Sequence, residues 1–230
     1  MDDPPTEHAK DKMAAGARAL VKGAVGAVPV AGSFLSEVVD LLYRAPIEQR
    51  REEWLRELTG ALSEVQERQD ELTPERLASN PEFVTVLHQV TEVAIRTHLS
   101  EKREQLRNVV VHAALPTAPE LDKQLFFVRL VEDLTLNQVL ILTLYRDPRG
   151  WFAERDRAPK EFMSAGRDQV VKQAYPELAN SEFFDGLVVG DLVRRGLLNS
   201  LGGMVTGGSV YDRMTSPLAD QFLDYISRDA

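Results

Sequence analysis

The hydrophobic positions ahead of residue 116 recur at intervals of three and four, which predicts amphipathic helices. The clearest stripe covers about residues 46–71, where one face is apolar and the opposite face is charged. Pro46 suits the first turn of such a helix, and Glu48 suits the positive end of its dipole. We therefore expect a packed helix that ends near Glu71. Its apolar stripe comprises Ile47, Trp54, Leu55, Leu58, Ala61, Leu62, Val65 and Leu72.

Two proline-containing segments mark further helix starts. Thr73-Pro74 and Asn80-Pro81 each place a capping side chain before a proline at the first helical position. The second start predicts one long helix from about Pro81 to Ala114, which the prolines of residues 115–119 stop. Because short connections between long helices favour antiparallel packing, we expect an antiparallel helical bundle over residues 1–115.

The segment from Ala9 to Tyr43 is rich in alanine, glycine and valine, and Pro29 and Gly32 interrupt it. It predicts two helical pieces, of which the second, from about Ser33 to Tyr43, is amphipathic. This segment fits either a close-packed helix or a membrane-active one, although its polar face lacks the basic residues that attract anionic lipid. The candidate membrane-binding or partner-binding residues are Leu20, Val28, Pro29, Phe34, Leu35, Val38 and Leu42.

Past a proline linker at residues 116–119, the pattern changes to shorter elements. The predicted elements are an apolar segment over 121–134, a Thr-capped helix over 136–145, a loose stretch over 147–159 with Trp151 and Phe152, and helices over about 166–175 and 181–195.

The end of the chain has the element order of a winged helix-turn-helix. The helix over residues 181–195 has Asn180-Ser181 as its cap, and Gly196 ends it. A glycine-rich tract at residues 202–211 then separates two short pieces that can form strands, and a closing helix follows with Leu218, Phe222 and Ile226. The fold class is therefore mainly all-α, with a winged-helix-like domain and a small two-stranded wing over residues 120–230.

Several segments carry a family resemblance. LVRRGLL (192–198), followed by the glycine-rich tract and by MTSPLADQFL (214–223), resembles the end of a winged-helix domain, with Ala219 where that pattern usually has glycine. VPVAGS (28–33), PIEQRREEWLREL (46–58) and the segment over 80–110 resemble a family of bacterial helical-bundle proteins with a C-terminal winged-helix-like domain. This resemblance covers most of the chain and implies architecture rather than chemistry.

Composition narrows the class of protein. The 230 residues include no cysteine, which excludes disulfides and thiolate metal sites and fits a reducing compartment. Met1 to Lys12 does not resemble a secretory signal, and the longest uncharged stretch, Gly23 to Ser36, is shorter than the ~20 residues of a spanning helix. We expect a cytoplasmic protein without a transmembrane helix.

No constellation of residues predicts catalysis. The four histidines are His8, His88, His98 and His112. His88 and Glu92 are four apart and could share a helix face, but no second acidic ligand is positioned to complete a metal site. The glycine-rich tract lacks the Lys-Ser/Thr ending of a phosphate loop. We therefore expect no enzyme, no cofactor and no metal.

The function expected from these patterns is a non-enzymatic protein-interaction or regulatory module that acts through helical surfaces, with a protein partner or a second copy of itself. A membrane-active effector that uses the N-terminal segment is one alternative.

The other alternative is a DNA-binding regulator whose phosphate contacts are Arg194, Arg195 and Arg213. The net charge of −9 and the acidic Glu182 and Asp185 in the expected recognition helix oppose it. These arginines also fit a structural role, because cations favour the end of a helix.

Overall fold

The computed structural model describes residues 45–67, 69, 72–179, 188–200 and 202–228. The chain divides into two compact units, Met1–Glu53 and Trp54–Ala230. Of the first unit, only residues 45–53 are described, and they form the beginning of helix α3 (Ala45–Gln66). The predicted N-terminal helical pieces therefore lie outside the described residues, with Leu20, Val28, Pro29, Phe34, Leu35, Val38 and Leu42.

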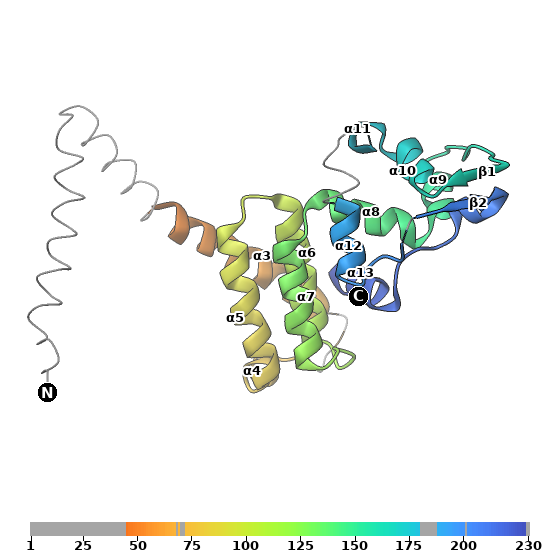
Figure 1. The fold of residues 1–230 in the computed structure, drawn as a ribbon. Helices are drawn as coiled ribbons and strands as arrows, with labels where there is room; N and C mark the ends of the chain where they lie inside the picture. Colours follow the sequence, from red (N-terminus) through yellow and green to blue (C-terminus); the bar gives the residue numbers. More distant parts are fainter. Residues whose placement is uncertain (1–44, 68, 70–71, 180–187, 201, 229–230) are drawn as a thin grey trace, which may run out of the picture. The chain divides into compact units, whose positions relative to one another are not determined.

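The described part of the unit Trp54–Ala230 is mostly helical and contains one small two-stranded antiparallel sheet (Figure 1). The mainly helical fold class is confirmed. No helix within the described ranges is both long and apolar enough to cross a membrane.

The first helix starts follow the predicted capping residues. The Thr73 side chain accepts a hydrogen bond from the Arg76 backbone N–H at the start of α4 (Pro74–Ala78). The Asn80 side chain accepts from the backbone N–H groups of Glu82 and Phe83 at the start of α5 (Pro81–Arg96). Helix α3 is also confirmed, although it ends at Gln66 rather than near Glu71.

The prediction of one helix from Pro81 to Ala114 is wrong. The chain leaves the helix at Thr97, which has extended backbone angles, and a separate helix α6 (Ser100–Ala114) follows. The Thr97 hydroxyl accepts a hydrogen bond from the Leu99 backbone N–H at 3.2 Å. This local bond competes with helical hydrogen bonding, and the break lets α6 turn back and pack against α5.

The next two helices compare differently with the predictions. Helix α8 (Leu136–Arg146) begins at Thr135 with a complete capping box, as its Thr cap predicts. The stretch over 147–159, predicted to be loose, instead contains α9 (Pro148–Ala153), because the Asp147 side chain accepts from the Gly150 backbone N–H ahead of a proline at the first turn.

The sheet pairs segments that are far apart in sequence. Strand β1 (Ser164–Gly166) runs antiparallel to β2 (Met204–Thr206), with Ala165 opposite Val205. The sequence analysis placed both strand-forming pieces beside the glycine-rich tract, whereas the structure takes one of them from before α10 (Asp168–Ala174). Leu198 and Thr215, which flank the tract, form only an isolated bridge.

The helix predicted over 166–175 starts two residues later than expected because Gly166 lies in β1. Of the helix predicted over 181–195, the structure describes only the end, α12 (Gly190–Arg194), and its Asn180-Ser181 cap lies outside the described residues. Gly196 ends this helix with a φ of +69°, a conformation that glycine adopts without strain. The remaining elements are α11 (Pro176–Ala179), the short 3-10 helix η2 (Gly207–Tyr211) and the closing helix α13 (Pro217–Ile226).

One hydrophobic core runs through this unit from Trp54 to Ile226. Helices α5, α6 and α7 (Leu121–Asp133) pack against one another, and α13 packs on α6 and α8. The Phe127 ring of α7 lies 5.7 Å from the ring of Phe222 and 5.4 Å from that of Tyr225 in α13. The core therefore crosses the proposed linker at 116–119. The division into domains at 1–115 and 120–230 stays a prediction, because packing does not test whether the two parts fold separately.

Two buried hydrogen bonds fix α13 in this core. The Asn108 side-chain amide of α6 donates to the Ile226 carbonyl at 2.9 Å, and the Tyr225 hydroxyl donates to the Gln124 side-chain oxygen at 2.7 Å. Asn108, Gln124 and Tyr225 are all buried, so water cannot reach their polar groups and each bond supplies the hydrogen-bond partner that these groups need.

Replacing Tyr225 with phenylalanine tests this attachment. Tyr225→Phe removes one donor and leaves the buried Gln124 oxygen without it, so we expect the free energy of unfolding to fall by about 1–2 kcal/mol in urea denaturation. Gln221→Ala, an exposed position on the same helix, is the control and should change this free energy by less than about 0.5 kcal/mol. Equal stability of Tyr225→Phe and the unmodified protein would contradict the assigned role.

Candidate functional site

The three arginines that the sequence analysis proposed as phosphate contacts each pair with a carboxylate of this chain. Arg194 lies 3.4 Å from Asp191, and Arg195 contacts both Asp191 at 2.8 Å and Asp133 at 3.1 Å. Arg213 pairs with Asp220 and also donates to the Thr215 hydroxyl.

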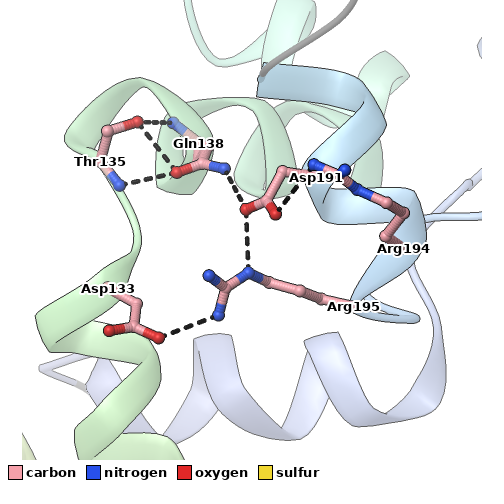
Figure 2. A network of polar contacts seen from close by, with 6 residues as sticks. All are labelled: Asp133, Thr135, Gln138, Asp191, Arg194 and Arg195. Atoms are coloured by element: carbon pink, nitrogen blue, oxygen red, sulfur yellow. Dashed lines mark hydrogen bonds and ion pairs between the residues drawn. The ribbon is translucent and has the colours of Figure 1, made fainter.

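Arg194, Arg195 and their partners form a network that joins three helix ends (Figure 2). Gln138 completes the capping box of α8 by accepting from the Thr135 backbone N–H at 2.8 Å. The amide nitrogen of the same side chain donates to Asp191 of α12 at 2.9 Å. Figure 2 shows the Arg195 guanidinium between the carboxylates of Asp191 and Asp133, the last residue of α7. The network therefore connects α7, α8 and α12.

The electrostatics of this network favour the charged forms of its members. Burial raises the pKa of Asp191, but hydrogen bonds from Arg195 and Gln138 and the nearby arginine charges outweigh it, so the pKa lies below its ordinary 3.8. The hydrogen bond to Asp133 raises the pKa of Arg195 above its already high value. Two carboxylates thus balance two guanidinium groups.

This balance decides what the cluster can do chemically. A phosphate group would have to compete with Asp191 and Asp133 for Arg195, and only Arg194, whose side chain is 71% exposed, is readily accessible. The geometry therefore describes a structural joint between helices. Sequence analysis found the arginines but missed Asp133 and Gln138, which are 62 and 53 residues away from their partners in the network.

A second surface has no counterpart in the sequence analysis. Met163, next to β1, is 96% exposed, and Met204 of β2 is 75% exposed. We call these two side chains, with strands β1 and β2, the Met surface. Met204 pairs with Gly166 at one end of the β1–β2 ladder, and Met163 precedes Ser164 at the other end. Soluble proteins usually bury methionine, so these two exposed side chains are candidate contact residues.

The surroundings of the Met surface are held by a polar network. The Tyr211 hydroxyl donates to the Lys160 carbonyl at 2.8 Å, and the Gln173 side chain accepts from the Lys160 backbone N–H at 2.9 Å. The Gln173 amide also donates to the Tyr211 hydroxyl at 2.8 Å. The loop that leads to Met163 is thereby tied to α10 and η2.

Metal ligands do not gather in the described part of the chain. His88, His98 and His112 are described, and no group of three or more histidine, aspartate or glutamate side chains there could hold a metal ion. His8 lies outside the described residues.

Comparison with known proteins adds no assignment. No protein-family model, no curated protein and no solved structure matches this chain. The resemblance to bacterial helical-bundle proteins thus stays a prediction.

Asp191→Asn tests the joint in Figure 2. Because the folded-state pKa of Asp191 is lowered, the carboxylate stabilises the fold above about pH 4, and this contribution disappears as the pH falls through the folded-state value. We expect the variant to unfold with a free energy about 1–2 kcal/mol lower at pH 7, and this gap to shrink towards pH 3.

Urea denaturation between pH 7 and pH 3 measures the gap. Asp212→Asn is the control, because Asp212 is exposed and should change the free energy by less than about 0.5 kcal/mol. A gap that stays constant over this pH range would show that the charge of Asp191 is not what stabilises the joint.

Proposed function

We propose that this chain is a non-enzymatic protein-interaction module whose partner contacts the Met surface. The observation that carries the proposal is the exposure of Met163 and Met204, 96% and 75%. Burying a methionine side chain contributes about 1.5–3 kcal/mol, so a partner that covers both would gain most of this free energy. The flexible thioether also adapts to irregular apolar surfaces, which suits recognition of another protein.

The polar network around the Met surface supports the same proposal. Because Tyr211, Gln173 and the Lys160 backbone hold the loop before β1, little ordering remains to be done on binding. Two exposed apolar side chains on a rigid support suit a specific protein contact.

A winged-helix-like arrangement of the C-terminal elements is also part of this proposal. The order of α8, β1, α10, α12, β2 and α13, together with the bridge between Leu198 and Thr215, supports a winged-helix-like arrangement. We propose that this arrangement serves contact with a protein in the cytoplasm of a bacterium.

DNA binding, one alternative from the sequence, is less well supported. Arg195 and Arg213 already pair with carboxylates, and the net charge of −9 opposes the approach of a polyanion. The membrane alternative concerns the N-terminal segment, which lies outside the described residues, and it stays a prediction.

A photoreactive residue at the Met surface tests the proposal. With p-benzoylphenylalanine at position 163 of the full chain, irradiation in the cell of origin should give one discrete adduct. Met204→Ser in the same chain should reduce its yield roughly tenfold, because a buried methionine contact is lost. An adduct at about twice 25.7 kDa would identify the partner as a second copy of this chain.

The same photoreactive residue at position 129, exposed on α7 away from β1 and β2, is the matched control and should give no such adduct. Equal adducts at both positions, or none at position 163, would contradict the proposed contact.

The DNA alternative makes a separate prediction. If the arginines are structural, Arg194→Ala should leave the affinity for a random DNA duplex unchanged, within about twofold, in fluorescence anisotropy at low salt. A steep salt dependence of binding that this variant reduces would favour the DNA-binding alternative instead.

A further inference from the structure

A cavity of about 500 Å³ lies where the end of α6, residues 117–119, the first turn of α7, the end of α8 and helix α13 meet. This volume falls within the range of about 300–1,000 Å³ that small-molecule sites occupy. The cavity is separate from the Met surface and from the network in Figure 2, because it shares no residue with either. The lining residues that bear on its chemistry are His112, Ala118, Pro119, Lys123, Arg146 and Tyr225.

The aromatic part of the lining is apolar and fixed in place. The rings of His112 and Tyr225 lie 5.5 Å apart and are tilted by 35°, and Ala118 and Pro119 add further apolar surface. The Tyr225 hydroxyl donates to Gln124, whose amide donates to the Pro119 carbonyl at 2.6 Å. Burial also raises the pKa of Tyr225 far above its ordinary value, so the phenol stays neutral.

His112 is oriented in a similar way. Its Nδ1 lies 3.0 Å from the Asn108 carbonyl oxygen, which can only accept, so Nδ1 carries the proton and donates. The cavity thus contains two aromatic rings that are each held by a hydrogen bond.

The polar part of the lining is cationic. Lys123 contacts the neutral amide of Gln221 at 3.1 Å, and among the described residues no carboxylate pairs with it. Arg146 pairs with Asp224 at 2.5 Å. Two positive charges therefore face one negative charge, and an anionic group would complete the balance.

We propose that this cavity binds a small organic anion, namely a carboxylate, sulfonate or phosphate group on a flat apolar body. Lys123 and Arg146 contact the anionic group, and the rings of His112 and Tyr225 pack against the flat body. The lining comes from helices held by the buried bonds of Asn108 and Tyr225, so the cavity is largely formed before a ligand arrives.

Fluorescence titration with 8-anilinonaphthalene-1-sulfonate, which joins an anionic group to flat rings, tests this proposal on the full chain. Saturable binding that benzoate displaces and benzylamine does not displace is the expected result. Absence of saturable binding, or equal displacement by the cationic benzylamine, would overturn the proposal.

Two substitutions with opposite effects locate the binding. Lys123→Gln should weaken the affinity for the dye at least roughly fivefold, because it removes the lysine charge. Asp224→Asn should strengthen the affinity about twofold or more, because Arg146 loses its competing carboxylate.

Arg129→Gln, an exposed position on the same helix as Lys123, is the matched control and should leave the affinity unchanged. Met163→Ser excludes dye binding at the Met surface if the affinity is kept. Circular dichroism checks that every variant is folded. Unchanged affinity in both Lys123→Gln and Asp224→Asn would overturn the assignment to this cavity.

Discussion

The packing of α13 against α6, α7 and α8 is the interaction on which the rest of this unit depends. Phe222 and Tyr225 contact Phe127, and two buried polar bonds set the depth and rotation of the helix. Apolar contact alone would permit several positions of α13 along its neighbours. The hydrogen bonds that the Asn108 amide and the Tyr225 hydroxyl donate each form in only one of these positions. The shape of the cavity beside Tyr225 follows from that position.

Charge compensation explains why the arginines at the end of α12 need not form a nucleic-acid surface. Asp191 and Asp133 hold Arg195 between them, and Gln138 connects this group to the cap of α8. Without Gln138, the Thr135 backbone N–H at the start of α8 would lack this partner, and without the arginines the carboxylates of Asp191 and Asp133 would be unbalanced. Among the described residues, Met163 and Met204 are the most exposed large hydrophobic side chains, and we propose the partner contact there instead.

Local signals were predictable from the sequence, and distant pairings were not. Thr73, Asn80 and Thr135 act as caps as predicted, because a cap depends on residues two or three positions away. The break at Thr97 was missed because no proline or glycine marks it in the sequence. The pairing of β1 with β2 and the contact of Asp191 with Gln138 join residues that are about 40 and 53 positions apart, so no local pattern reveals them.

The bond between Asn108 and Ile226 spans 118 positions of the chain. During synthesis, the apolar faces of α6 and α7 emerge long before the helix that covers them, and the core cannot close until residue 226 has been made. Such a delay leaves hydrophobic surface open to chaperones and to neighbouring nascent chains. For this fold, aggregation is therefore a greater risk during translation than after folding is complete.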